Sequence, residues 1–183
     1  MEMLTAERLA ADPRYRRCEL WDGIPVVKAP SGWFSSFVGA NLCGMLWQHV
    51  RERRIGWVGG ADVGFLLRRA PDRLLSPDIA FVSFATLASP PRAAFAECVP
   101  DFVGEVQSPS DSRRELIQKC LIWASHGVPV VWMVEPERRS VLVFRPDWAP
   151  EEYAAGSRVG AVPSLPEFEI AVDDLFVPPG GRA

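Results

Sequence analysis

The sequence has little of the chemistry that most zinc sites and serine hydrolases use. It contains two histidines in 183 residues, and its four cysteines form no Cys-x-x-Cys pair. These shortages argue against a zinc site of the usual His/Cys kind and against a Ser-His-Asp hydrolase. The cysteines, at positions 18, 43, 98 and 120, are expected to be reduced thiols of a cytoplasmic protein, with a disulfide framework as the alternative.

Long apolar runs and an excess of basic residues are also missing. No apolar run approaches the roughly 20 residues that cross a bilayer, and the N-terminal MEMLTAERLAAD lacks the apolar stretch of a signal peptide. We therefore expect a cytoplasmic location and no membrane partner. The formal net charge is −3, whereas a protein that coats DNA is usually basic. Any contact with nucleic acid must come from local arginine clusters or a bound cation.

Apolar residues are plentiful, at 48%, which is enough to build the core of one domain over residues 1–183. The patterns predict a short helix at TAERLAAD, a hairpin turning at Asp22-Gly23, a helix from about 32 to 54 and another after Ser112. Strands are predicted at 56–67, 79–84, 102–106, 128–134 and 140–144. A loop is predicted over 146–160, and a strand with a closing turn over 168–176. This order predicts an α/β or α+β fold, with a mixed central sheet flanked by helices.

Two carboxylates stand where the chain is expected to enter the core. Asp78 opens the strand in SPDIAFV, and Glu105 lies inside the strand in DFVGEVQ. Burying a carboxylate without a partner is costly, so we expect both to share a positively charged group. Simpler interpretations stay open. Asp78 could satisfy a turn amide, and Glu105 could form a structural ion pair with Lys119 or an arginine.

Together these segments resemble the PD-(D/E)xK nuclease fold and, more narrowly, the Uma-two family of restriction-type endonucleases. The matching pieces are CELWDGIPV, SPDIAFV, PDFVGEVQSPSDS, the helix with Lys119 and Trp123, GVPVVWMVEP and LPEFEIAVDDLF, from about residue 5 to 176. The resemblance implies a restriction-endonuclease-like fold with an N-terminal helix and β-hairpin. It also implies an enzyme that uses Mg²⁺ or Mn²⁺ to hydrolyse double-stranded DNA, leaving 5′-phosphate and 3′-hydroxyl ends.

The resemblance assigns the metal to the carboxylates of Asp78 and Glu105 and to the main-chain carbonyl of Val106. Oxygen ligands of this kind suit a hard divalent cation, which would polarise the scissile phosphate. Glu19, in CELWDG, corresponds to the N-terminal glutamate of the family pattern and would complete the metal shell. Its alternative interpretation is an exposed hairpin residue.

The sequence departs from the motif at Gln107, which occupies the position of the motif lysine. Glutamine can hydrogen-bond a water molecule but supplies no cation. Lys119, in the following helix, matches the place to which this family moves the lysine. There it would orient the attacking water and stabilise charge in the transition state. A second departure is Phe34, in the region where the family often has a histidine.

Arg113 and Arg114 begin the helix that carries Lys119, and we expect them to contact DNA phosphates. A homodimer would suit two cuts on one duplex, on the analogy with other nucleases. Two other functions stay open. One is a catalytically weak or inactive member of the same fold that binds nucleic acid or protein, which the pI of about 5.5 and Gln107 favour. The other is a hydrolase of a small phosphorylated substrate.

Overall fold

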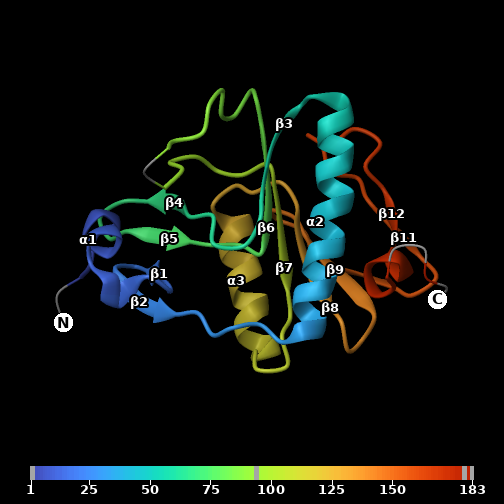
Figure 1. Ribbon diagram of the computed structural model, residues 1–183, viewed down its shortest axis with the longest axis horizontal. Helices are drawn as coiled ribbons and strands as arrows, with labels where there is room; N and C mark the ends of the chain where they lie inside the picture. The colour runs from blue at the N-terminus through green and yellow to red at the C-terminus, as the bar shows by residue number, and fades with distance from the viewer. Residues whose placement is uncertain (1–2, 93–94, 179–180, 182–183) are drawn as a thin grey trace.

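The centre of the protein is a six-stranded mixed sheet (Figure 1). The computed structural model describes residues 3–92, 95–178 and 181. The strand order in this sheet is β10-β9-β8-β7-β6-β3. Its strands are β3 (Gly56–Gly59), β6 (Ile79–Ser83), β7 (Phe102–Val106), β8 (Val131–Glu135), β9 (Ser140–Phe144) and β10 (Glu151–Ala154). β7 and β8 run parallel, and the other neighbouring pairs run antiparallel.

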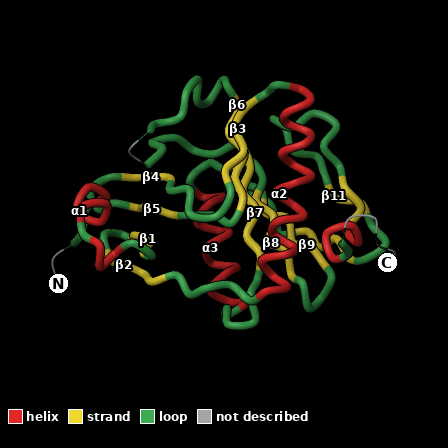
Figure 2. The backbone as a smooth tube through the Cα atoms, viewed as in Figure 1, coloured by secondary structure: helices red, strands yellow, loops and turns green. Residues whose placement is uncertain are grey.

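Two helices cover opposite faces of this sheet, whose strands lie between them in Figure 2. The first is α2 (Trp33–Arg53), and the second is α3 (Arg113–Ser125), which links β7 to β8. Side chains alternate along a strand, so Phe102 packs in the cluster under α2 and Val103 in the cluster under α3. Two residues beyond Val103, Glu105 also faces α3. The sheet therefore presents this carboxylate to the helix that carries the predicted lysine.

The ends of the helices follow from local capping chemistry. The Thr5 hydroxyl accepts a hydrogen bond from the main-chain N–H of Arg8, and the Ser112 hydroxyl accepts one from that of Glu115. These two caps begin α1 (Ala6–Ala11) and α3 at the places that the sequence predicts. α2 ends at Arg54, which takes a left-handed conformation with φ of 53°.

A four-stranded sheet lies beside the central sheet and contains the N-terminal hairpin. Its strands are β1 (Cys18–Trp21), β2 (Ile24–Val27), β4 (Phe65–Arg68) and β5 (Arg73–Leu75), and the one-turn helix η1 (Pro13–Tyr15) precedes β1. Leu20 of β1 pairs with Leu74 of β5. The chain leaves β5 through Ser76 and enters β6 directly afterwards, so this pairing brings the hairpin next to the start of β6.

The C-terminal segment packs against α2 through β11 (Arg158–Val159), β12 (Ile170–Ala171) and η2 (Val172–Phe176). The loop predicted over residues 146–160 is wrong in part, because β10 and β11 lie within it. Exposed strands with few apolar residues carry little periodic signal. The strand and closing turn predicted over 168–176 are present as the two residues of β12 followed by the helical turn η2.

The strand predicted over 56–67 is two strands in different sheets, β3 and β4. The chain turns between them at a glycine-rich stretch, where Asp62 has a φ of 74°. The mixed central sheet, the flanking helices and the N-terminal helix and hairpin confirm the predicted fold class. Of the helices within the described residues, none has the length and apolar character needed to cross a membrane.

Two glycines give a matched test of this packing. A Cβ on Gly56 would meet the main-chain oxygen of Val82 and, at 2.6 Å, the ring of Phe81, whereas one on Gly44 would meet nothing within 4 Å. We expect Gly56→Ala to lower the free energy of unfolding by about 1–3 kcal/mol. We expect Gly44→Ala, in an exposed turn of α2, to raise it by about 0.4–1 kcal/mol. Urea denaturation measures both, and equal effects would contradict the close approach at Gly56.

Candidate active site

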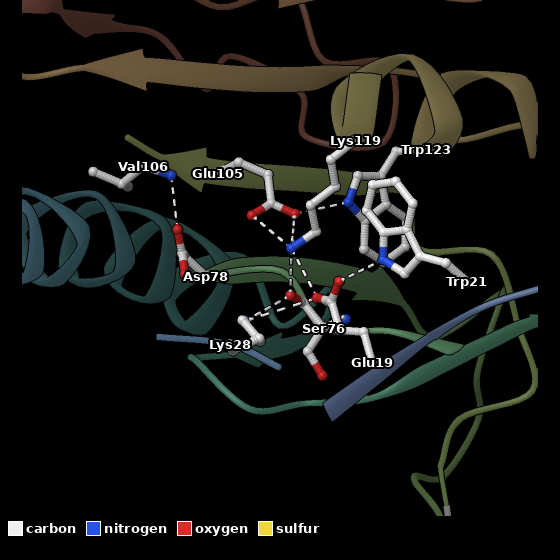
Figure 3. A network of polar contacts seen from close by, with 9 residues as sticks. All are labelled: Glu19, Trp21, Lys28, Ser76, Asp78, Glu105, Val106, Lys119 and Trp123. Atoms are coloured by element: carbon white, nitrogen blue, oxygen red, sulfur yellow. Dashed lines mark hydrogen bonds and ion pairs between the residues drawn. The ribbon is translucent and has the colours of Figure 1, made fainter. Parts of the chain in front are cut away.

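The site begins where the pairing of β6 with β7 stops. The register ends at Ile79 and Gly104, so Glu105 and Val106 extend beyond the paired part of β6. Asp78 takes the place of a strand partner there, because its Oδ2 accepts a hydrogen bond of 2.7 Å from the main-chain N–H of Val106 (Figure 3). The carboxylate thus satisfies a backbone amide, although the amide belongs to the neighbouring strand and not to its own turn.

Glu105 is buried against α3, as the alternation along β7 requires. Its Oε1 accepts a hydrogen bond of 2.8 Å from the indole N–H of Trp123. The ammonium of Lys119 lies 2.9 Å from the same oxygen and 3.1 Å from Oε2. Lys119 and Trp123 are four residues apart on α3, so they present both donors from one face of the helix. The predicted ion pair of Glu105 with Lys119 is therefore present.

Glu19 is also buried, which excludes the alternative of an exposed hairpin residue. Its Oε2 accepts from the indole N–H of Trp21 at 3.0 Å, and its Oε1 accepts from the main-chain N–H of Ser76 at 3.0 Å. The Lys119 ammonium lies 2.9 Å from Oε1. The N-terminal hairpin therefore contributes a second carboxylate to the lysine of α3, across more than 90 residues of chain.

Lys119 has its three N–H donors directed at three protein groups. They are the carboxylates of Glu19 and Glu105 and, at 2.9 Å, the main-chain oxygen of Ser76 (Figure 3). A lysine ammonium carries three N–H groups and no acceptor. A role in orienting the attacking water would therefore require Lys119 to release one of these contacts.

The charges of the site are unbalanced. Burial by itself would lower the pKa of Lys119, but the carboxylates of Glu105 and Glu19 outweigh burial and raise it. Burial raises the pKa of Glu105 to about 7; Lys119 opposes the rise, and Asp78 and Glu19 add to it. Three carboxylates thus share the ammonium groups of Lys119 and the nearby Lys28. One negative charge is in excess, which a proton or a cation can neutralise.

The predicted metal ligands have the right chemistry for a hard divalent cation. Asp78 and Glu105 supply carboxylate oxygens and Val106 a main-chain oxygen, and the negative excess favours a cation. Among the residues that the structure describes, no three His, Cys, Asp or Glu side chains are grouped so as to hold a metal ion. A ligand set of two carboxylates and a carbonyl stays a prediction. The oxygens of Glu19 are held by Trp21, Ser76 and Lys119. Those of Glu105 are held by Trp123 and Lys119, so a cation at either carboxylate would replace some of these contacts.

A cavity of about 270 Å³ opens onto Asp78 and Val106. Its other walls are small side chains at the start of α2 and in the turn after β3, and they include Ser36, Gly39 and Gly60. Small residues leave room for a substrate to approach the half-buried carboxylate of Asp78. The other carboxylate of the predicted metal pair, Glu105, is buried on the opposite face of the sheet against Lys119 and Trp123 of α3.

The remaining predicted residues lie around this core. Gln107 is half-buried, and its main-chain oxygen accepts a hydrogen bond of 2.9 Å from the hydroxyl of Ser35. The Arg113 guanidinium holds the buried carboxylate of Glu135, at 2.6 and 3.2 Å, whereas Arg114 is exposed. Arg113 therefore has a structural partner whether or not it contacts DNA.

Sequence reasoning missed four groups of the site: the indoles of Trp21 and Trp123, the carbonyl of Ser76 and the ammonium of Lys28. Trp123 is expected in the core from its helix pattern, and nothing in the sequence indicates that either indole N–H serves a carboxylate. A main-chain carbonyl has no sequence signal at all. Lys28 follows the predicted hairpin, which also carries Glu19. Its place near a predicted site residue is the one sequence signal that Lys28 could belong to the site.

Comparisons with known proteins give the family of the chain and a solved structure with a similar fold. The model of the family Uma2, described as "Putative restriction endonuclease", matches residues 4–173. A solved structure with a similar fold is a "putative nuclease belonging to DUF820" from Anabaena variabilis ATCC 29413. The TM-score is 0.81 at 19% identity, and the match covers 94% of this chain and 97% of that chain. No curated protein matches the chain.

Proposed function

Because the chain belongs to the Uma2 restriction endonuclease family, we propose that it is an endonuclease that hydrolyses double-stranded DNA with the help of Mg²⁺ or Mn²⁺. The family membership confirms the resemblance that the motifs indicate. The observation that carries the proposal is the meeting of Asp78, Glu105 and Lys119, from three separate elements, at one negatively charged site. The products are 5′-phosphate and 3′-hydroxyl ends.

Each residue of the site has a defined task in this proposal. The carboxylates of Asp78 and Glu105 and the carbonyl of Val106 would hold the cation. When bound, the cation supplies Lewis-acid charge at the scissile phosphate. Val106 N–H orients Asp78, and Trp123 N–H and Lys119 orient Glu105, so both carboxylates are positioned before substrate arrives. Arg113 and Arg114, at the start of α3, remain proposed contacts to DNA phosphates. Arg113 also forms an ion pair with Glu135.

A non-catalytic binding module on the same fold is the second candidate. The observation that favours it is the full use of the Lys119 donors by protein groups, together with Gln107 at the motif position. Such a protein would retain the fold and the ion-pair network but would not need a divalent cation. Metal binding therefore separates the two candidates. The proposed homodimer and cytoplasmic location fit either of them.

Titration with Mn²⁺ tests the nuclease proposal without a cleavage assay. We expect the wild-type protein to bind Mn²⁺ in isothermal titration calorimetry, and Asp78→Asn to bind it roughly tenfold or more weakly. Asparagine can still accept the hydrogen bond from Val106 N–H, so the local structure is expected to stay intact. The variant loses only the charge of the carboxylate.

Glu151→Gln, an exposed carboxylate on β10 at the far edge of the central sheet, is the matched control and should bind Mn²⁺ like the wild type. Plasmid nicking in Mn²⁺ completes the test. A wild-type protein that binds no divalent cation at millimolar concentration, and leaves plasmid, single-stranded DNA and RNA intact, would exclude the nuclease and favour the binding module.

A further inference from the structure

The open end of the N-terminal hairpin gathers three basic residues. The main-chain N–H of Lys28, just beyond β2, donates a hydrogen bond of 2.7 Å to the main-chain oxygen of Arg17, just before β1. This bond extends the hairpin by one residue on each strand and sets Arg16, Arg17 and Lys28 at one end of it. We call these three residues the hairpin base.

Lys28 reaches the site but differs from Lys119 in its surroundings. Its ammonium donates to the main-chain oxygen of Ser76 at 2.9 Å, the carbonyl that Lys119 also uses. It lies 3.9 Å from Oε1 of Glu19, beyond hydrogen-bond distance. The side chain of Lys28 is 28% exposed, against 10% for Lys119. Lys28 thus has N–H groups directed at no described protein acceptor, whereas all those of Lys119 are used.

A cleft of about 1030 Å³ runs along the hairpin base and reaches Ser76, whose carbonyl accepts from Lys28 and Lys119. Arg16, Arg17, Lys28 and Ser76 all line it. Arg16 and Arg17 are exposed, and their guanidinium groups form no ion pair with any residue that the structure describes. Cations without carboxylate partners on the wall of a cleft favour an anionic ligand, because no local charge neutralises them.

The acidic residues of the cleft lie away from the hairpin base. Three line it, Glu7, Asp62 and Glu97, and Arg69 holds two of them, with ion pairs of 2.7 Å to Glu7 and 2.6 Å to Glu97. Arg69 carries one positive charge against the three negative charges of these carboxylates, so that side of the cleft is not basic. Besides Arg92, the cleft cations that form no ion pair with a described residue are Arg16 and Arg17 of the hairpin base. Lys28 adjoins them and reaches Ser76.

We infer that the hairpin base binds the phosphate backbone of the nucleic acid substrate, with Lys28 as the lysine that contacts substrate at the site. This inference rests on the proposed nuclease function and adds a binding surface to it. Lys119 then serves to hold Glu19 and Glu105, and Lys28 supplies the positive charge nearest to the incoming phosphate. Arg17 and Arg16 continue the contact along the strand of nucleic acid away from the site.

Salt-dependent binding tests the arginines. The affinity of the protein for a 20-base-pair duplex is measured by fluorescence anisotropy in EDTA, so that no cleavage occurs, at several salt concentrations. In Arg16→Gln/Arg17→Gln we expect the slope of log affinity against log salt to become shallower by about 1.8, or 0.9 for each lost phosphate contact. The matched control, Arg51→Gln/Arg158→Gln, removes the same charge from the end of α2 and from β11, and its slope should equal that of the wild type.

Lys28→Met tests the contact at the site. We expect it to raise the Kd for the duplex and the KM for cleavage in Mn²⁺ roughly tenfold, with only a small fall in the thermal unfolding midpoint, because Lys28 contacts Ser76 but lies 3.9 Å from Glu19. A purely structural Lys28 would lower the unfolding midpoint but leave Kd unchanged. Equal salt slopes in the hairpin-base variant and the control would also overturn the inference, even if cleavage is intact. Conversely, a wild type that binds duplex through the hairpin base but never cleaves it overturns the proposed function alone.

Discussion

Lys119→Met is expected to lower the free energy of unfolding by about 3–5 kcal/mol at pH 8. The substitution keeps most of the side-chain volume but removes the ammonium that lies 2.9 Å from both Glu19 and Glu105. Those two carboxylates are buried, and no other group takes over the direct contact to both. Urea denaturation followed by tryptophan fluorescence measures the change, and the indoles of Trp21 and Trp123 touch the affected carboxylates.

The loss should grow as the pH rises. Burial raises the pKa of Glu105 to about 7 in the folded protein, and removing Lys119 removes the larger of the two charge effects, from Lys119 and Lys28, that oppose this rise. A carboxyl with a raised folded-state pKa binds a proton in the native state that it has already lost in the unfolded state. Stability therefore falls as the pH rises from the unfolded-state pKa towards the folded-state pKa. In Lys119→Met this fall continues beyond pH 7, so the variant is nearest to wild-type stability in mild acid.

The double variant Lys119→Met/Glu105→Gln is the control for this effect. It removes one buried carboxylate together with the ammonium, so we expect it to recover part of the stability that the single variant loses. Its stability should also depend less on pH above 7. A single variant that unfolds at the wild-type urea concentration at both pH 6 and pH 8 would show that Lys119 does not stabilise the buried carboxylates.

Glu105→Gln is expected to lower the rate of DNA cleavage in Mn²⁺ by at least about 100-fold. Glutamine occupies nearly the same volume, and its oxygen can accept from Trp123 or Lys119, but it has no charge to offer a cation. The cost in stability should be about 1 kcal/mol, well below that of Lys119→Met. Plasmid cleavage and urea denaturation on the same preparation separate the two effects.

Asp101→Asn is the matched control for this prediction. Asp101 precedes the other end of β7, and its carboxylate accepts hydrogen bonds of 2.8 Å from Ser83 N–H and 2.9 Å from the Ser164 hydroxyl. Asp101→Asn also replaces a carboxylate with an amide, but at the other end of β7. It should leave the cleavage rate within a few-fold of the wild type. If Glu105→Gln and Asp101→Asn cleave equally well, Glu105 is not part of the catalytic machinery.

Asp78 and Glu105 drew attention because each is a charge in a strand-like segment, whereas Lys119 was predicted only from the resemblance that the motifs carry. The structure places Lys119 against Glu105, and Asp78 against the main chain next to Glu105. Alternation along β7 then predicts that Glu105 and Val103 share a face. Glu19 was selected from its motif, but its burial was not predictable, because it depends on the pairing of β1 with β5, a strand that the sequence pattern did not reveal.

By itself, the sequence determined the type of fold and the order of its main elements, since these depend on local periodicity and capping. The carboxylates and lysine of the site are predictions that rest on the resemblance of the motifs to a family. Tertiary structure alone decided how the hydrogen bonds are shared. Lys119 meets two carboxylates and the Ser76 carbonyl, and Lys28 meets only the last of these within hydrogen-bond distance. Which donors are used up depends on distances of a few ångströms between segments far apart along the chain, and local sequence patterns carry no information about such distances.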